Sequence, residues 1–138
     1  MTPRRQKRRV STKTGDGRGS ALAAGRRNHD QVVRAICSYC ELVLHAPATI
    51  TDAARYGKAG FYSGNRVKPG WPDITACLPP HGTMLCVEVK TSKTGKANNP
   101  RDNQAVVIQG LREAGAVVIV TSDLTDFTQR IKEWDNGR

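Results

Sequence analysis

The chain has 138 residues and a net charge of +10 at pH 7, with 38% hydrophobic and 5% aromatic residues. This length allows one domain with a modest core, and no apolar stretch approaches the roughly 20 residues that a membrane span needs. The apolar segment 22–24 is too short for the core of a signal peptide. We therefore expect a soluble, cytoplasmic protein without a membrane partner, whose four cysteines are reduced thiols.

Most of the positive charge lies near the N-terminus. Residues 1–30 hold nine Lys or Arg against two Asp, a balance of +7, and the other 108 residues contribute only +3. Segment 1–27 has few side chains able to form a core, so we expect a basic, disordered tail before a domain at 28–138. Such a tail adds salt-dependent affinity for DNA or RNA, although a solubilising or targeting tail is the alternative. Its candidate phosphate contacts are Arg4, Arg5, Lys7, Arg8 and Arg9.

A first helix is predicted from Asn28 to about Leu44. Asn28 is a suitable N-cap, and apolar residues recur after it at helical spacing. One face of the helix should therefore lie in the core. The residues of that face are Val32, Ile36, Tyr39, Cys40 and Val43.

The cysteines leave a zinc site open as one interpretation. Cys37 and Cys40 have the spacing of half a site, but Cys77 and Cys86 are separated by eight residues, which is not a standard ligand spacing. Buried thiols are the preferred interpretation.

The segment 45–68 carries few structural signals. Proline and glycine interrupt it, so the one strand we expect here lies at about 60–63. Its basic residues suit a loop beside nucleic acid and suit a solvated surface loop equally well, with Arg66 and Lys68 as candidate phosphate contacts. Nearby aromatic side chains can stack on unpaired bases, although burial is the better explanation for most of them. These are Tyr56, Phe61, Tyr62 and Trp71.

Two strands joined by a tight turn form the clearest local pattern. Segments 73–78 and 83–90 both alternate small or polar residues with apolar ones, and 79–82 is a turn signal. If 79–82 form the loop of an antiparallel hairpin, Leu78 lies opposite Thr83.

Counting outward along this hairpin places Asp73 opposite Glu88, with Cβ atoms roughly 5 Å apart. Like charges in that position destabilise a purely structural hairpin, whereas a divalent cation removes the repulsion. Mg²⁺ or Mn²⁺ suits such carboxylates. Lys90 lies on the same face as Glu88, where an amine can hold an attacking water or neutralise charge on a phosphate. These three residues are the minimum set for metal-assisted phosphodiester cleavage.

The C-terminal part contains a helix, a strand and a helix. Asn99 as N-cap and Pro100 at the first position begin the first helix, and Gly115 ends it. The apolar run 116–120 predicts a strand covered on both faces, and the helix crossing before it implies parallel pairing. Ser122 then caps a last helix. Its apolar stripe consists of Leu124, Phe127, Ile131 and Trp134.

The loop at 90–96 is rich in lysine but lacks the pattern of a nucleotide-binding P-loop. A basic loop leaving the strand of Glu88 can still touch the substrate backbone. Lys93 and Lys96 are candidate phosphate contacts, with exposed solubilising lysines as the alternative.

The motif Gly-Trp-Pro-Asp at 70–73, followed by Glu-Val-Lys at 88–90, resembles the PD-(D/E)xK nuclease superfamily and within it the VRR-NUC branch. The resemblance covers about 28–127 in outline, and its informative residues lie between 70 and 120. It implies an α/β fold with a restriction-endonuclease-like core, in which helices flank a mixed β-sheet. The implied order is helix, strand, β-hairpin, helix, strand, helix, and 28–138 would be a VRR-NUC-like nuclease domain.

The resemblance also implies a metal site. Mg²⁺, or Mn²⁺, would be held by Asp73, Glu88 and the backbone carbonyl of Val89. The resemblance implies that an acidic residue on the first helix assists the metal site, which makes Asp30 a further candidate and Glu41 another. Asp30 also has a structural explanation as an acid near the positive end of a helix dipole. The implied catalytic residues are Asp73, Glu88, Lys90 and Gln104, the last reaching back toward the amine or the water.

We therefore expect a metal-dependent endonuclease that hydrolyses DNA, with a preference for branched, flapped or four-way structures as in several relatives. The alternatives are a non-catalytic nucleic-acid-binding module and an accessory subunit of a larger DNA-processing complex. Relatives of this small size often act as homodimers, so a homodimer is a further expectation, with the last helix as one candidate interface.

Overall fold

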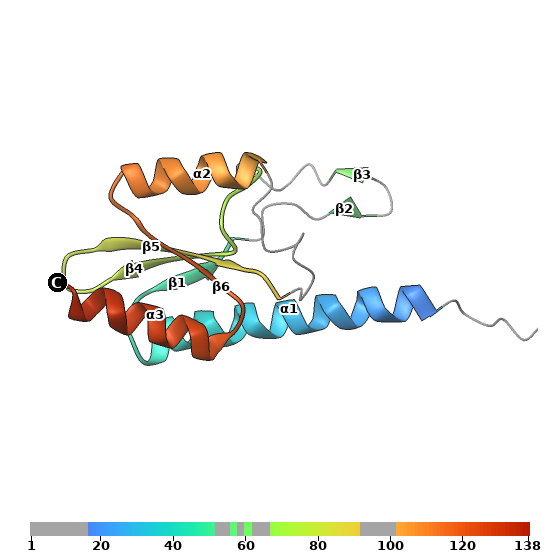
Figure 1. Cartoon of the computed structure of the whole chain (residues 1–138), viewed down its shortest axis with the longest axis horizontal. Helices are drawn as coiled ribbons and strands as arrows, with labels where there is room; N and C mark the ends of the chain where they lie inside the picture. The colour runs from blue at the N-terminus through green and yellow to red at the C-terminus, as the bar shows by residue number, and fades with distance from the viewer. Residues whose placement is uncertain (1–16, 52–55, 58–59, 62–66, 92–101) are drawn as a thin grey trace, which may run out of the picture.

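The computed structural model describes residues 17–51, 56–57, 60–61, 67–91 and 102–138. A four-stranded mixed sheet lies between helices, with α1 and α3 on one face and α2 on the other (Figure 1). This arrangement confirms the predicted α/β fold class and the predicted order of its main elements. The elements are α1 (Gly17–Leu42), β1 (Ala48–Ile50), β4 (Ile74–Leu78), β5 (Thr83–Val89), α2 (Asp102–Glu113), β6 (Val117–Thr121) and α3 (Leu124–Asn136), with a separate pair formed by β2 (Tyr56–Gly57) and β3 (Gly60–Phe61).

The sheet has the strand order β1-β4-β5-β6. β4 and β5 form the predicted antiparallel hairpin, with Leu78 opposite Thr83 and Ile74 opposite Val87. β5 and β6 are parallel, as predicted, because α2 crosses between them. The alternation and the turn residues of this segment were therefore sufficient to predict its pairing and register.

The core has two parts because side chains alternate across the sheet. The larger part lies between the sheet and the helices α1 and α3, where Phe127 is fully buried and meets the Tyr39 ring edge to face at 6.0 Å. The smaller part lies under α2 and contains Cys86, Val107 and Leu111. Side chains of β6 contribute to both parts, which confirms the prediction of a strand covered on both faces. The predicted stripe of α3 also packs into the larger core.

Helix α1 begins at Gly17 rather than at Asn28. Segment 17–27 contains three glycines but also Ala, Leu and Arg residues that favour a helix and no proline, and in the structure this part of the expected tail is helical. Residues 1–16 lie outside the described ranges. At its other end the helix stops at Leu42, so Val43 is 54% exposed and the prediction that it joins the core was wrong. Neither α1 nor another helix in the described ranges has the length and apolar character to cross a membrane.

The edge strand β1 was predicted in the order of elements but at the wrong residues. β1 at Ala48–Ile50 pairs antiparallel with β4, whereas β3 at Gly60–Phe61 pairs only with β2 in a separate hairpin. The expected strand at about 60–63 therefore exists in part but is not the strand of the main sheet, and 62–66 lie outside the described residues. A three-residue strand is too short to show alternation, and its pairing with β4 decides its position.

Two further predictions needed correction. Asp123, not Ser122, caps α3, because the Asp123 carboxylate accepts the backbone N–H of Asp126 at 2.8 Å. Cys77 is exposed rather than buried, since it lies on the same sheet face as α2 but beyond the part that α2 covers. Cys40 and Cys86 are buried, and Cys37 is half-buried. Gly115 follows α2 with φ of +91°, as expected of a residue that ends a helix, whereas Asn99 and Pro100 lie outside the described part of the chain.

Candidate active site

One end of the sheet brings together polar side chains from three elements. Asp73 directly precedes β4, Glu88 is near the end of β5, and Lys90 directly follows β5. The register of Ile74 with Val87, extended by one residue, places Asp73 opposite Glu88 on the same face. Gln104 approaches this face from the first turn of α2.

Glu88, Lys90 and Gln104 form a closed triangle of hydrogen bonds. The amine of Lys90 is 2.7 Å from Glu88 Oε1 and donates to Gln104 Oε1 at 2.9 Å. The amide Nε2 of Gln104 donates to the same Glu88 oxygen at 3.0 Å. Each side chain is therefore positioned by the other two, and the predicted approach of Gln104 to Lys90 is present in the structure.

Asp73 is held through both its side chain and its backbone. Its Oδ2 accepts the backbone N–H of Val89 at 2.8 Å, which ties the start of β4 to the end of β5. Thr51, just after β1, donates its backbone N–H to the Asp73 carbonyl at 2.7 Å and its hydroxyl to the Pro72 carbonyl. The unexpected strand β1 thus fixes the backbone that carries the carboxylate.

Gly70, the first residue of the motif, approaches α2 closely. Its φ is +86°, and a Cβ built on it would lie 2.7 Å from the carbonyl oxygen of Asn103. Both the backbone conformation and the lack of space require glycine here. Since Asn103 precedes Gln104, this contact sets the distance between the loop of Asp73 and the first turn of α2.

His29 is a site residue that the sequence interpretation missed. Its Nε2 lies 3.2 Å from the Val89 carbonyl oxygen and 3.5 Å from Asp73 Oδ2. Its Nδ1 lies 3.7 Å from Asp30 Oδ1. A signal for it exists, because His29 shares the helical spacing of Val33, Ile36 and Cys40 and so continues the core face of α1 toward the end of the sheet.

The electrostatics of the site favour added positive charge. Glu88 is only 3% exposed, and its burial, together with the nearby carboxylate of Asp73, raises its pKa against the opposing effect of Lys90. The hydrogen bond with Asp73 raises the pKa of His29, although partial burial acts in the opposite direction. Two acidic groups therefore share a largely desolvated position that a cation would stabilise.

The oxygen donors at this end of the sheet suit the predicted metal. Across the described ranges no three His, Cys, Asp or Glu side chains converge as a preformed metal cage. The predicted set instead combines two carboxylates, of Asp73 and Glu88, with the carbonyl of Val89. Oxygen donors of this kind suit Mg²⁺ and Mn²⁺, which retain water and substrate oxygens in their remaining positions. The residues present therefore fit such an ion.

Other predicted site residues lie elsewhere. Asp30 is exposed and lies beside His29, and Glu41 lies eleven residues further along α1, about 16 Å away along the helix axis. Lys68 is exposed in the loop before Gly70. The remaining predicted phosphate contacts fall outside the described residues and are Arg4, Arg5, Lys7, Arg8, Arg9, Arg66, Lys93 and Lys96.

Comparison with known proteins gives one structural similarity to report. No family model and no curated protein matches the chain. A solved structure described as a VRR_NUC domain matches with a TM-score of 0.44 and 21% identity, over 80% of this chain and 92% of that chain. Its description names the branch that the motifs at 70–73 and 88–90 resemble.

Proposed function

We propose that this chain is a metal-dependent endonuclease that hydrolyses phosphodiester bonds in DNA. The observation that carries the proposal is the triangle of Glu88, Lys90 and Gln104 beside the carboxylate of Asp73. This cluster consists of a buried acid, a second acid, an amine and an amide. Stability of the fold does not explain it, because buried charges cost free energy. Together they supply the groups that phosphoryl transfer to water requires.

Each residue has a proposed role. Asp73, Glu88 and the Val89 carbonyl would hold Mg²⁺ or Mn²⁺, which would supply a water of lowered pKa and positive charge beside the scissile phosphate. Lys90 donates hydrogen bonds to the attacking water or to a phosphate oxygen. Gln104 Oε1 accepts one hydrogen bond from the Lys90 ammonium and Glu88 accepts a second, which aims the remaining N–H at the water or the phosphate. The water oxygen would form a new bond to phosphorus in line with the leaving oxygen as the P–O bond of the strand breaks. The proton of the water would pass to solvent, and the leaving oxygen would take a proton from solvent.

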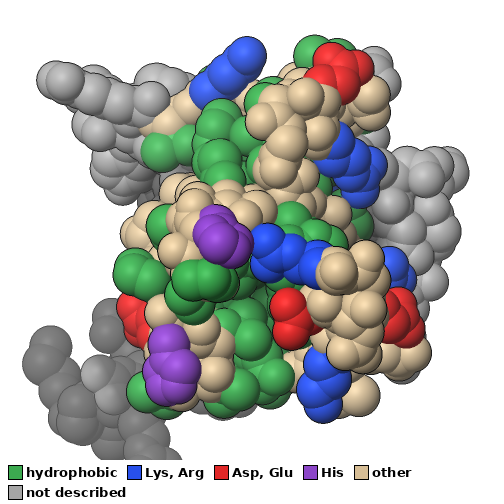
Figure 2. Space-filling model, turned by 90° about the vertical axis from the view of Figure 1, so that its left-hand side faces the viewer, with side chains coloured by type: hydrophobic (Ala, Val, Ile, Leu, Met, Phe, Trp, Pro, Cys, Tyr) green, Lys and Arg blue, Asp and Glu red, His purple; other side chains and the backbone are tan. Residues whose placement is uncertain are grey.

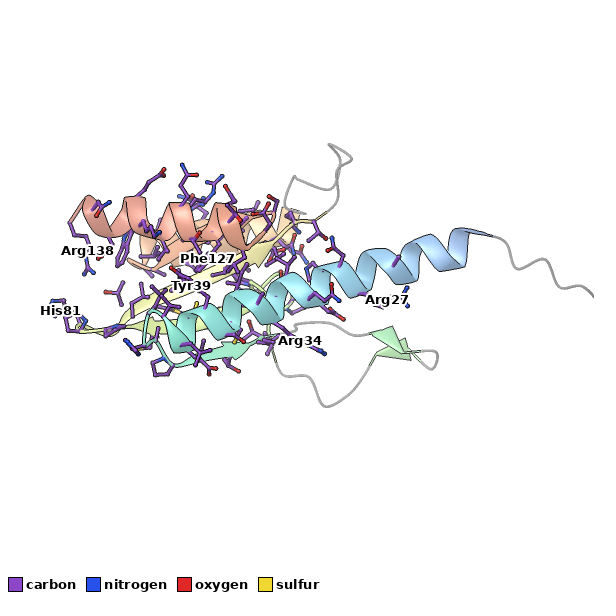
Figure 3. The ribbon with its side chains drawn as sticks, turned by 90° about the horizontal axis from the view of Figure 1, so that it is seen from below. Arg27, Arg34, Tyr39, His81, Phe127 and Arg138 are labelled. Carbon is purple, nitrogen blue, oxygen red and sulfur yellow. The ribbon has the colours of Figure 1, made fainter. Side chains whose placement is uncertain are left out.

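The charge of the chain supports a polyanionic substrate. The net charge is +10, and Arg27 is exposed on the part of α1 that extends beyond the end of the sheet (Figure 3). His29 lies two residues further along the same helix, so Arg27 is close to the proposed site along α1. We propose DNA with a branched, flapped or four-way structure as the preferred substrate, and a homodimer as the form in which two sites meet two strands.

The test is cleavage mapping on linear, nicked, flapped and four-way DNA with Mg²⁺, with Mn²⁺ and with a chelator. The wild-type chain should cut only with metal, and Asp73→Ala should abolish both cutting and metal binding. The cleavage rate of Lys90→Ala should be lower by a factor of at least about 100, because the amine acts on the water or the phosphate. This variant should still bind metal. Cleavage by Lys90→Ala at the wild-type rate would show that the role given to this amine is wrong.

The same assays separate the two alternatives. The strong positive charge also suits a non-catalytic nucleic-acid-binding module, or an accessory subunit of a DNA-processing complex. Salt-dependent DNA binding without cleavage under any metal would support the binding module. Copurification with a larger complex, again without intrinsic cleavage, would support the accessory subunit.

A further inference from the structure

His29 lies where a cation ligand would lie. Its Nε2 is 3.2 Å from the Val89 carbonyl oxygen and 3.5 Å from Asp73 Oδ2. Two ligands at right angles around an ion, each bound at about 2.1 Å, are about 3 Å apart. The separations of the nitrogen from each of the two oxygens are therefore close to those of donors that bind one ion.

The helix presents His29 on a rigid segment. Because α1 begins at Gly17, His29 lies about three turns inside the helix rather than at a frayed end. One and two turns further along the same face, Val33 and Ile36 are buried in the core and hold the helix against the sheet. The position of the imidazole is therefore determined by core packing.

The second nitrogen of the ring also has a partner. Nδ1 lies 3.7 Å from the carboxylate of Asp30. Histidines that bind metals usually direct their other ring N–H to a carboxylate or carbonyl, which fixes the tautomer and the orientation of the ring. Asp30 is in the position for this role, which differs from the role of direct ligand that the sequence interpretation considered.

We propose that His29 binds the catalytic metal ion through Nε2, and that Asp30 is a positioning residue for its ring. The inference rests on the proposed function, since it concerns the same ion. It adds a nitrogen donor to a site otherwise made of oxygens. Imidazole favours transition ions over Mg²⁺, so His29 should increase the preference of the site for Mn²⁺.

The experiment measures Mn²⁺ binding to the full chain without DNA, by electron paramagnetic resonance and calorimetry. In the wild type, electron spin echo modulation should show coupling of Mn²⁺ to a directly bound ¹⁴N. In His29→Ala this coupling should vanish, and the affinity for Mn²⁺ should fall by a factor of at least about ten. The loss of Mg²⁺ affinity should be smaller. Asp30→Asn should retain the nitrogen coupling and lose less affinity.

The chain offers a matched control in His81, which is exposed in the turn between β4 and β5, at the opposite end of the molecule from Arg27 (Figure 3). His81→Ala should bind Mn²⁺ as the wild type does. Circular dichroism in chelator checks the fold of each variant, and His29→Gln replaces His29→Ala if the alanine variant unfolds.

The outcomes distinguish this inference from the proposed function. Nitrogen coupling that persists in His29→Ala, or an unchanged or higher Mn²⁺ affinity, overturns the role of His29. If Asp73→Ala still abolishes binding in that case, the metal-dependent function stands without it. If the wild type binds no Mn²⁺ at all, both proposals fail.

Discussion

At the scale of single residues, the amine of Lys90 depends on its neighbours for its position. Glu88 and Gln104 both contact it within 3 Å, and the same Glu88 oxygen also accepts from Gln104. A lysine side chain has many rotamers, so two partners restrict it far more than one does. Gln104 therefore has a proposed role in aiming the amine, separate from that of the carboxylates.

Gln104→Ala should slow DNA cleavage about 10- to 100-fold, because Lys90 loses one of the two groups that aim it. The free energy of unfolding should fall by no more than about 1–2 kcal/mol, since the side chain is only half-buried. Gln109→Ala is the control, as Gln109 lies on the exposed part of the same helix and pairs with Glu113. Single-turnover cleavage and urea unfolding measure both effects, and equal cleavage rates for the two variants would contradict the role of Gln104.

The cysteines should differ sharply in reactivity. Cys77 is exposed, whereas burial raises the pKa of Cys40 to about 11. At pH 8 a thiol with that pKa is thiolate in only about one molecule in a thousand, and the thiolate is the reactive form. In the native protein iodoacetamide should therefore modify Cys77 well before Cys40, and unfolding in urea should remove the difference. Peptide mass spectrometry measures this order; equal labelling of the two thiols in the native protein would show that the described burial is wrong.

At the scale of elements, the site depends on contacts between segments that are distant in sequence. Thr51, which follows β1, holds the backbone of Pro72 and Asp73. The loop at Gly70 lies against the first turn of α2, next to Gln104. The site is thus a junction of α1, β4, β5 and α2, and its geometry depends on how closely these elements approach.

Gly70→Ala should displace α2 and with it the side chain of Gln104. The new Cβ would meet the Asn103 carbonyl, and alanine is strained at φ of +86°, so the free energy of unfolding should fall by about 1–3 kcal/mol. Cleavage should fall further than this stability loss explains, because Gln104 moves with the helix.

Gly110→Ala is the matched control, since a Cβ there has no neighbour within 4 Å and lies inside α2. It should stabilise the protein by about 0.5–1 kcal/mol. Urea unfolding and cleavage of both variants provide the comparison. If the two substitutions change stability equally, the close approach of Gly70 to α2 is not a real constraint.

At the scale of the whole molecule, positive charge is not spread over every surface. The face that carries the turn between β4 and β5 shows acidic side chains among Lys, Arg and apolar groups, without a continuous basic field (Figure 2). At the other end, α1 extends past the sheet with Arg27 exposed (Figure 3). In the sequence, nine of the 22 Lys and Arg residues fall within 1–30, so much of the positive charge belongs to the N-terminal part of the chain.

Replacing the five cations of the N-terminal segment with serine should therefore weaken DNA binding without changing the fold. Those residues are Arg4, Arg5, Lys7, Arg8 and Arg9. The dependence of the logarithm of the binding constant on the logarithm of salt concentration should become shallower by up to about 4, if all five release counterions. Fluorescence anisotropy at several salt concentrations measures the slope, and an unchanged slope would show that this segment does not contact phosphates.

Much of the fold follows from local sequence signals. The β-hairpin, the register that sets Asp73 opposite Glu88, the crossing helix α2 and the stripe of α3 all depend on alternation, periodicity and turn residues within short segments. Such patterns can be recognised in a short segment alone, because each element must bury one face and its apolar residues therefore recur with the period of that element. The same local reasoning predicted Asp73, Glu88 and Lys90 as neighbours, while the resemblance added Gln104.

Tertiary packing decided the rest. The pairing of β1 with β4, the close approach of Gly70 to Asn103 and the presence of His29 beside Asp73 join residues that are 24 to 44 positions apart. No local period encodes such contacts, because each exists only when two separately folded segments are pressed together by the core. The sequence by itself therefore determined the β-ribbon with its acids and, through the resemblance, pointed to Gln104. Only the packing of α1, β1 and α2 around the ribbon brought His29, Thr51 and Gly70 to the same end of the sheet.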